Sequence, residues 1–440
     1  MHLYLPFVNV AWFIATKVAR SSSKTFSRVI IRIAVGTVAL SVAVMLLTTA
    51  LIRGFKQQIS EKIFGFWGHI HITSADVGRS IVETRPISIN QDFYPYIDTI
   101  GRLQFVQPHR IFGYKLPIQW PQYTRGGVSH IQAFALKPGI IKVKDQIEGI
   151  ILKGIGRDFD WSFLEQYLVR GRPLELADEQ PTREVLISQQ TADRLQIDTA
   201  DQFVVHFVEH NQQIRRRFKV VGIYKTGLEE YDKRFALVDI RVIQQLMGWD
   251  STQVAGFEIF LDDIRDLTLF ADYIYYEILP NNLWAETIRE KFPEIFEWLE
   301  LQDINEVVII ALMLIVSVLN MVTMLLILIL ERTNMIGILK ALGYTNWGVR
   351  RIFLYYAAWI IGNGLLWGNV IGLGLGWLQQ RYAFIRLSEA DYYLKAAPVS
   401  FDLWSILLIN VGSLIVILLF LLLPSWLVAR IHPVKAIRFN

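Results

Sequence analysis

The chain of 440 residues contains no cysteine, which excludes disulfide bonds and thiolate metal ligands. A lipid attached to an N-terminal cysteine is excluded as well, so the chain is not expected to be lipid-anchored itself. The sequence also contains no GxxxxGKS or GxxxxGKT motif and no Gly-Lys pair. It therefore lacks the loop that cradles nucleotide phosphates, and any dependence on ATP would have to come from another chain.

Charge is nearly absent from four long apolar stretches. Each stretch is long enough to cross a bilayer as a helix, which takes roughly 20 apolar residues. Hydrophobic residues make up 53% and charged residues 19% of the chain, too apolar for an ordinary soluble protein and too polar for a pure membrane bundle. The first stretch exceeds a signal h-region and is expected to be an uncleaved span. We predict transmembrane helices over residues 29–53, 305–330, 352–378 and 403–428.

The remaining segments divide by charge. Residues 1–28, 331–351 and 429–440 are rich in Lys and Arg and poor in acids, which predicts that all three are cytoplasmic. Residues 54–304 and the loop 379–402 would then lie outside. Within the first segment, residues 7–19 are amphipathic and are expected at the membrane interface. The predicted orientation depends on the following cations: Lys17, Arg20, Lys24, Arg28, Arg332, Lys340, Arg350, Arg351, Arg430, Lys435 and Arg438.

Residues 54–304 have the pattern of an α/β domain. Short runs rich in apolar and β-branched residues predict strands, and longer mixed runs predict helices. We expect a split core over about 68–140 and 252–300, with an inserted subdomain over about 160–250. A helix over 290–306 would run directly into the second span as a stalk. Strands are predicted at 68–72, 130–136, 184–188, 201–210, 215–224, 254–261 and 283–288, and helices at 92–103 and 263–275.

The loop between the second and third spans carries a short helical pattern of its own. Met335, Ile338, Leu339 and Leu342 recur at the spacing of one helix face. Gly343 follows where a helix C-cap favours a left-handed residue. An amphipathic helix between two spans is suited to docking a partner at the membrane surface. Alternatively, the loop is a topology signal whose apolar face rests on lipid.

Small and polar residues inside the spans point to helix packing. Small residues four apart let helix backbones approach closely in lipid, within a protomer or across a dimer. The GLGLG string in the third span has no strand before it, which argues against a dinucleotide site. Asn320, in the second span, is expected to make an interhelical hydrogen bond, with a transport role as the alternative. The glycines are Gly364, Gly368, Gly372 and Gly376.

No pattern predicts a catalytic, metal or nucleic-acid site. His69 lies near His71, and His206 near His210, but metal ligation needs three or four converging donors. No nucleophile, base and acid constellation is evident. The Arg215 to Arg217 run is expected to be a solvated strand flank. The formal net charge is only +4, with the bases gathered beside the spans, which does not predict nucleic-acid binding.

Several of these stretches resemble one family. ERTNMIGILKALGYTNWGVRRIF resembles the coupling loop of FtsX/MacB-type ABC permeases, and PVKAIR resembles their C-terminal PxxAhR ending. The order of one span, a large domain and three spans is also that of the family. Four further stretches resemble lipoprotein-releasing permeases of the LolC/LolE type: FIATKVAR, IRGFKQQISEKIFGFWGHIHI, KDQIEGIILKGIGRDFDW and RRRFKVVGIYKTGLEEYD.

The resemblance implies a non-catalytic permease subunit in the bacterial inner membrane, with a MacB-like core in the periplasm. A separate ABC ATPase, holding ATP and Mg, would contact the chain at Met335, Ile338, Leu339, Leu342 and Gly343. A second permease protomer, the same or homologous, would complete a complex that extracts lipoproteins. Mechanical coupling would then transfer the cargo to a periplasmic carrier and the outer membrane.

The sequence departs from LolC at one point. LolC-type chains carry a protruding hairpin that grips the carrier, whereas here only a tight connection around residues 211–214 separates the matching strands. Carrier docking by this chain is therefore left open. The alternative functions are efflux and control of cell-wall hydrolases, coupled to ATP hydrolysis by a related permease. MacB itself would carry a fused ATPase domain, and the hydrolase-control type has a much smaller external domain.

Overall fold

The computed structural model describes residues 13–14, 25–76, 85–106, 110–111, 114–115, 121–143, 146–176, 180–209 and 212–430. Most of the predicted interfacial segment 7–19, the PVKAIR ending and His210 lie outside these residues. The chain divides into two compact units. The helical unit comprises the described parts of Met1–Gln57, Trp298–Leu387 and Ala396–Asn440, and the sheet unit comprises those of Gln58–Glu297 and Ser388–Lys395.

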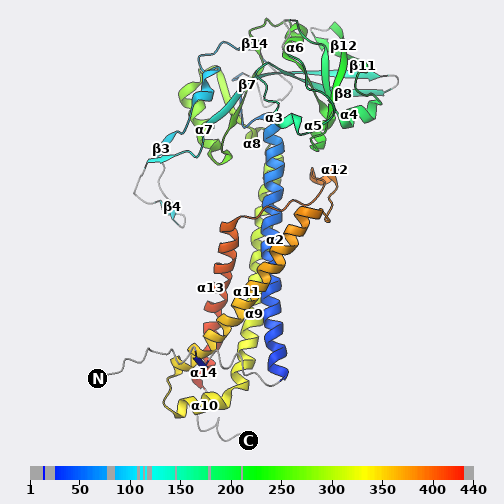
Figure 1. Ribbon diagram of the computed structural model, residues 1–440. Helices are drawn as coiled ribbons and strands as arrows, with labels where there is room; N and C mark the ends of the chain where they lie inside the picture. Colours follow the sequence, from blue (N-terminus) through cyan, green and yellow to red (C-terminus); the bar gives the residue numbers. More distant parts are fainter. Residues whose placement is uncertain are drawn as a thin grey trace, which may run out of the picture. The chain divides into compact units, whose positions relative to one another are not determined.

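Four helices of the structure are long and apolar enough to cross a membrane. Figure 1 shows them side by side in the helical unit. α2 and α9 extend beyond the apolar stretches that predict the first two spans, and each contributes residues to both units. The four are α2 (Thr25–Trp67), α9 (Pro293–Glu331), α11 (Asn346–Tyr382) and α13 (Leu403–Ser425); the shorter α10 (Thr333–Ala341) and α14 (Leu427–Arg430) also belong to this unit.

Local chemistry sets the helix ends. α9 begins at Pro293, whose missing N–H is tolerated in a first turn. The side chain of Thr345 accepts a hydrogen bond from the Gly348 N–H at the start of α11, and Asp402 caps α13 in the same way.

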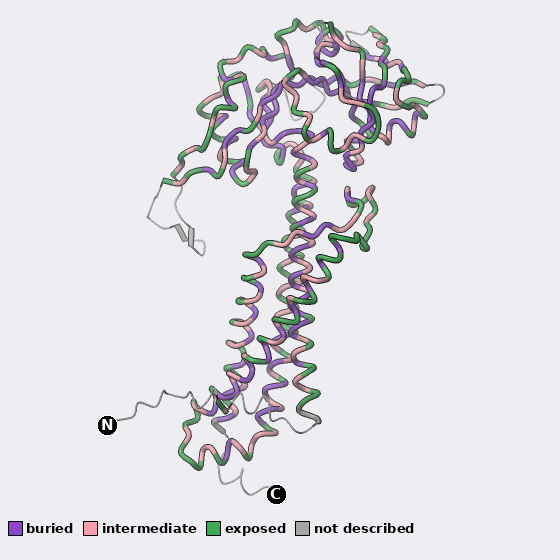
Figure 2. The backbone as a smooth tube through the Cα atoms, viewed as in Figure 1, coloured by how far each residue is buried: buried purple, intermediate pink, exposed green. Residues whose placement is uncertain are grey.

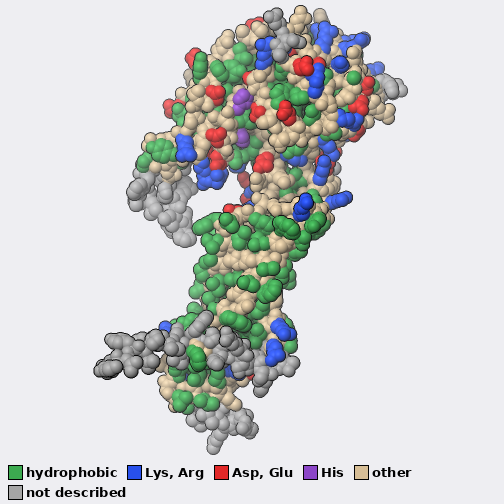
Figure 3. Space-filling view, viewed as in Figure 1, with side chains coloured by type: hydrophobic (Ala, Val, Ile, Leu, Met, Phe, Trp, Pro, Cys, Tyr) green, Lys and Arg blue, Asp and Glu red, His purple; other side chains and the backbone are tan. Residues whose placement is uncertain are grey.

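The helical unit has a narrow apolar core and an apolar exterior. Side chains such as Val42, Leu325, Tyr356 and Ile417 are buried between the helices. Figure 2 shows buried and exposed residues following one another along these helices. The outward faces are also hydrophobic, and Figure 3 shows such side chains over the visible face of this unit. An apolar exterior of this kind is suited to lipid rather than water.

The ten-stranded sheet of the other unit begins with a split βαβ arrangement. Strands β16, β1, β15 and β7 are neighbours in that order, all antiparallel, and α7 connects β15 to β16. The predicted strands of the core and the predicted helix at 263–275 are confirmed. These elements are β1 (Ile70–Ser74), β7 (Val128–Val143), β15 (Gly256–Leu261), η2 (Ile264–Asp266), α7 (Leu267–Tyr273), the π-helix η3 (Ile274–Ile278), β16 (Leu283–Thr287) and α8 (Ile288–Lys291).

The strands of the middle section close into a barrel that shares β7 with the core. Going round, the strands are β7, β8, β13, β10, β12 and β11, and β11 pairs back onto β7. The residues at 160–250 therefore continue the same sheet. These elements are β8 (Gln146–Ile155), α3 (Ser162–Glu165), β9 (Leu168–Gly171), β10 (Glu184–Ser188), α4 (Gln189–Leu195), β11 (Gln202–Glu209), β12 (Gln212–Tyr224), α5 (Glu229–Arg234), β13 (Phe235–Asp239) and α6 (Ile240–Met247).

Strand β7 belongs to both the core and the barrel. One of its edges pairs with β8, and the strand that pairs with its other edge changes along its length. Residues up to Phe134 pair with β15, whereas Ile140 to Lys142 pair with β11. Gly139 lies at the change, where a Cβ atom would come within 2.7 Å of Val205 Cγ1. The absence of a side chain there lets β7 pass close to β11.

Two sequence predictions need correction. The helix expected at 92–103 is only the 3-10 helix η1 (Tyr96–Thr99), because Pro95 disfavours helical backbone before it. The stalk helix expected from residue 290 is interrupted at Phe292, between α8 and α9. The remaining short elements are β2 (Ile87–Ser88), β3 (Gln104–Val106), β4 (Arg110–Ile111), β5 (Tyr114–Lys115), β6 (Pro121–Tyr123), β14 (Gln253–Val254) and α12 (Glu389–Tyr392).

Candidate functional site

The loop predicted to dock a partner contains α10, which ends in a Schellman motif. Gly343 has φ +86°, as its predicted left-handed cap conformation requires. The Tyr344 N–H donates to Leu339 O at 2.9 Å and the Gly343 N–H donates to Lys340 O at 3.0 Å. The helix therefore has a fixed end, and the chain turns directly into α11.

The four apolar side chains predicted to form one face of α10 do not present one outward surface. Met335 and Leu339 pack against the core of the helical unit, next to the fully buried Ile336. Ile338 and Leu342 are 54% and 79% exposed. Angle around the axis does not explain this difference, because Met335 and Leu342 lie only about 20° apart. Leu342 instead follows the last residue of α10, Ala341, one turn beyond the part of the helix that packs on the core.

Trp347, at the start of α11, adds to the exposed apolar surface of this loop, and the sequence analysis did not single it out. Its side chain is 48% exposed, and the guanidinium carbons of Arg350 and Arg351 lie 5.4 and 5.5 Å from its ring. The sequence signal that could have singled out Trp347 is an aromatic residue close to two arginines in a predicted docking loop. We call Ile338, Leu342 and Trp347 the loop surface.

Two cations tie this loop to the C-terminal helices: Lys340, on α10, contacts α14, and Arg350, on α11, contacts the end of α13. Lys340 Nζ donates to Val428 O at 2.7 Å, and Arg350 Nη2 donates to Leu422 O at 3.0 Å. Arg350 Nε also donates to Ser425 Oγ at 3.1 Å. Cations are favourable at helix C-termini, where carbonyl groups lack helical partners. A displacement of α10 would therefore be passed to α14 through Lys340.

The glycine row of α11 faces α2. A Cβ atom on Gly364 would lie 2.6 Å from Val38 Cβ, and one on Gly368 would lie 2.7 Å from Val42 Cβ. Gly372 faces the backbone of Ala43 at 3.2 Å. Gly376 lies instead against the ring of Phe401. The contacts described here are within one protomer.

Asn320 makes no interhelical hydrogen bond among the described residues. Its Nδ2 donates to Val316 O, one turn earlier on the same helix, at 3.2 Å. The interhelical amide pair is formed by two residues that the sequence analysis passed over, Asn369 on α11 and Asn410 on α13. Both are amides inside apolar spans, so the signal that singled out Asn320 applied to them equally.

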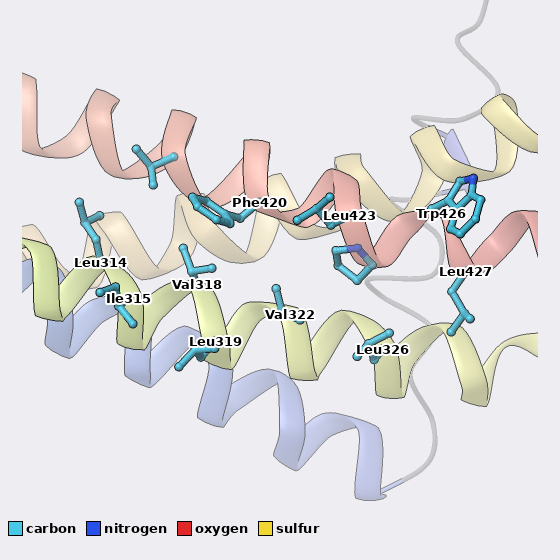
Figure 4. Close-up of a pocket in the computed structure, with 12 residues that line it drawn as sticks. Leu314, Ile315, Val318, Leu319, Val322, Leu326, Phe420, Leu423, Trp426 and Leu427 are labelled. Carbon is cyan, nitrogen blue, oxygen red and sulfur yellow. The ribbon is translucent and has the colours of Figure 1, made fainter.

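An apolar groove of about 600 Å³ separates α9 from the end of α13. Figure 4 shows side chains of the two helices facing each other across it. Every residue that lines it is apolar, so it suits hydrocarbon and offers no hydrophilic path. The lining residues are Leu314, Ile315, Val318, Leu319, Val322, Leu326, Val416, Phe420, Leu423, Pro424, Trp426 and Leu427.

Two histidines of the sheet unit, His69 and His71, bond to backbone groups of the fold. His69 Nδ1 accepts the Leu261 N–H at 3.0 Å, and His71 Nε2 lies 2.6 Å from Trp67 O. In the part of the chain that the structure describes, no three His, Asp or Glu side chains gather as metal ligands. Arg215 to Arg217 lie on β12, where the first and last are exposed.

Comparison with protein families matches both parts of the chain. The family described as MacB-like periplasmic core domain matches residues 33–274, more than half of the chain. The family described as FtsX-like permease C-terminal matches residues 307–433, which include α10 and the glycine row.

Two named relatives and one solved structure are similar to all or part of the chain. The lipoprotein-releasing system transmembrane protein LolE of Haemophilus influenzae is 23% identical over 98% of the chain and 99% of its own length. LolC of Xylella fastidiosa is 24% identical over 51% of the chain, and the match spans only 56% of that relative. Among solved structures, the extracellular domain of the ABC-type transporter YknZ from Gram-positive bacteria matches 36% of the chain and 81% of its own, at 16% identity and a TM-score of 0.26.

The two family matches follow one another along the chain, and the LolE match covers almost all of it. The chain therefore belongs to the permeases that combine a MacB-like periplasmic core domain with an FtsX-like C-terminal domain, and within them to the LolC/LolE type.

Proposed function

We propose that the chain is the permease subunit of an ATP-driven complex that extracts lipoproteins from the inner membrane. The complex would pass them to a periplasmic carrier and on to the outer membrane. The observation that carries this proposal is the pairing of a docking loop with a chain that has no phosphate-binding loop. Ile338 and Leu342 are exposed on that loop, so the energy source is expected to bind there.

The proposed topology follows from the charges. Residues 1–28, 331–351 and 429–440 would be cytoplasmic, because their cations retain them there. Residues 54–304 would form the periplasmic domain, and 379–402 a second periplasmic loop. The chain would then cross the bacterial inner membrane four times.

The proposed partners are an ABC ATPase subunit, which would hold ATP and Mg, and a second permease protomer, the same or homologous. The loop surface offers the ATPase an apolar contact, and α10 is tied by the hydrogen bond from Lys340 to α14. This chain would contribute no catalytic group and no cofactor of its own.

The connection between β11 and β12 bears on how a carrier would dock. β11 ends at Glu209 and β12 begins at Gln212, so two residues connect strands that bear a protruding hairpin in LolC-type chains. Those two residues lie outside the described part of the chain. Another surface, or the second protomer, would have to receive the carrier.

Extraction by mechanical force suits both an acylated cargo and apolar transmembrane helices. Removing an acylated anchor from a bilayer costs about 0.8 kcal/mol per buried methylene, so an energy source is needed. The groove and outer faces of the spans are apolar, which favours extraction at the lipid boundary over passage through a polar pore.

Depletion of the chain followed by membrane fractionation tests the function. Outer-membrane lipoproteins should accumulate in the inner membrane. Normal lipoprotein sorting, with efflux or septation impaired instead, would favour the related permease functions. Single cysteines test the topology in this cysteine-free chain: an impermeant reagent should label position 230 and not position 346, and the reverse pattern would overturn it.

A further inference from the structure

A buried polar network in the sheet unit receives the end of α2. Lys153 Nζ lies 2.8 Å from Glu258 Oε1, and the two side chains are 1% and 0% exposed. Gln132 Nε2 donates to the other carboxylate oxygen of Glu258 at 2.7 Å. His71 lies directly opposite Glu258 in the sheet, and Glu258 lies opposite Gln132. The four residues stand on four consecutive strands, β1, β15, β7 and β8.

This network holds the carbonyl groups at the C-terminus of α2. Lys153 Nζ donates to Phe66 O at 2.5 Å and lies over the rings of Phe66 and Trp67. His71 Nε2 lies 2.6 Å from Trp67 O, and because a carbonyl only accepts, Nε2 carries the proton. The last carbonyls of a helix have no helical partner. Here the strands supply partners for two of them.

The same network also contacts the segment that leads into α9. Lys291, the last residue of α8, lies with its Nζ 3.1 Å from His71 Nδ1. Phe292 and then Pro293, the first residue of α9, follow directly. Both helices that contribute residues to the helical unit and the sheet unit therefore have an end at Glu258 and its partners.

The titration properties of the network agree with this geometry. Burial lowers the pKa of His71 well below its usual value, which keeps the ring neutral so that Nδ1 can accept from Lys291. Burial also lowers the pKa of Lys153 and raises that of Glu258, and the 2.8 Å contact opposes both effects. Glu286, opposite His71 on β16, counteracts the lowered pKa of Lys291.

Stability alone is a poor reason for such an arrangement. A buried ion pair is often matched or exceeded in stability by apolar residues of similar volume. A buried polar network differs from apolar packing in that its contacts are directional. Hydrogen bonds weaken steeply with distance and angle, whereas apolar contacts are non-directional. Carbonyl groups at a helix C-terminus point along the helix axis, so the bond from Lys153 to Phe66 O opposes axial displacement of α2.

We propose that Lys153, Glu258, His71, Gln132 and Lys291 form an anchor through which movement of α2 and α9 reaches the sheet. The anchor residues are positioning residues, and their assignment to lipoprotein release rests on the proposed function. Without the anchor, the helices would still move when ATP is hydrolysed, but the sheet would follow them less closely.

The test uses the full chain, assembled with its ATPase and second protomer in lipid nanodiscs. Lys153→Met with Glu258→Gln removes both charges at nearly constant volume. ATP hydrolysis should stay within about twofold, while lipoprotein released per ATP hydrolysed should fall about tenfold or more. The control is Arg170→Gln with Asp198→Asn, an ion pair in the same unit with side chains 47% and 54% exposed, which should change neither quantity.

A spectroscopic readout separates the anchor from the proposed function. Spin labels on cysteines at Gln58, on α2, and Arg217, on β12, report the distance between α2 and the sheet. The distribution should broaden in the double variant and stay narrow in the control. Wild-type chain that releases no lipoprotein would refute the proposed function, while the distance distributions would still decide on the anchor.

A milder variant covers the case in which the double variant does not fold. Lys291→Gln cuts only the branch to α9, so distances from a label at Glu297 to Arg217 should broaden, while those from Gln58 should not. Lys291→Arg, which keeps the charge, should restore the narrow distribution. Unchanged distributions in Lys291→Gln, or unchanged release and distances in a folded double variant, would overturn the proposal.

Discussion

Asn369 and Asn410 exchange side-chain hydrogen bonds across α11 and α13. Asn369 Nδ2 donates to Asn410 Oδ1 at 2.6 Å, and Asn410 Nδ2 donates to Asn369 Oδ1 at 3.0 Å. Each amide also donates to a carbonyl one turn back on its own helix, Leu365 O or Ile406 O. The pair is therefore satisfied without water, which suits a position inside an apolar span.

Replacing Asn410 with Leu should weaken the contact between α11 and α13. The partner amide then loses its interhelical bond, which costs about 0.6–2 kcal/mol in membrane proteins. Unfolding of the purified chain in mild detergent measures this, and a double-mutant cycle with Asn369→Leu isolates the pair. Asn320→Leu is the matched control, because Asn320 bonds only to its own helix among the described residues. Equal losses for Asn320→Leu and Asn410→Leu would contradict the assignment.

Gly368→Leu should lower the stability of the helical unit. A Cβ atom at this position would lie 2.7 Å from Val42 Cβ and 2.9 Å from Ala39 O, and the backbone oxygen cannot move aside cheaply. Overpacking of this kind typically costs about 1–3 kcal/mol. The melting temperature in detergent is the measurement. Gly374→Leu, on the same helix with nothing within 4 Å of its Cβ position, is the control and should melt like the parent chain. Equal melting temperatures for the two variants would mean that α2 yields at this contact.

Sequence reasoning located the four spans and several strands because their signals are local. Strands such as Glu184–Ser188 follow from β-branched and apolar runs, and the left-handed Gly343 from its place after a short helical pattern. The barrel could not be predicted, because it depends on β7 pairing with β15 at one end and β11 at the other. No local pattern in residues 128–143 encodes two neighbours.

The outward surface of α10 and the anchor required tertiary information. The helical spacing of apolar residues groups Met335 with Ile338. Only the position of the core shows that Met335 packs inward. Lys153 and Glu258 are 105 residues apart along the chain, and each resembles an ordinary strand residue with a solvated charge. Their burial depends on where α2 ends, which the strand patterns do not reveal.

The loop surface yields a prediction with opposite outcomes for neighbouring residues. Ile338→Asp or Leu342→Asp places a charge on an exposed apolar contact, so the ATPase should no longer co-purify while the chain keeps its melting temperature. Leu339→Asp should instead lower the melting temperature, because Leu339 packs against the core. Ile338→Leu keeps the apolar surface and should retain the ATPase. Undiminished co-purification and ATPase activity in both exposed-site variants would refute docking at this surface.

His69 should make the stability of the sheet unit depend on pH. Its ring stacks on Phe64, and its Nδ1 accepts the Leu261 N–H at 3.0 Å, so the neutral form is required. Burial lowers the pKa of His69 to about 4. In the unfolded chain the value is near 6.5. Between pH 6.5 and 4 the unfolded state therefore binds a proton that the folded state does not, and stability falls as the pH falls.

The difference between the folded and unfolded pKa of His69 sets the size of the expected loss of stability. One proton over this window corresponds to about 3 kcal/mol, at about 1.4 kcal/mol per pH unit. Urea unfolding of the full chain in mild detergent measures this loss of stability. Hydrogen exchange of the β1 and β15 amides is the readout. His69→Gln can still accept the Leu261 N–H but cannot titrate, so its profile should be flatter by that amount. His71, whose pKa is also lowered by burial, contributes to the slope that remains. If the parent chain and His69→Gln lose stability at the same rate below pH 6.5, His69 is not the group responsible.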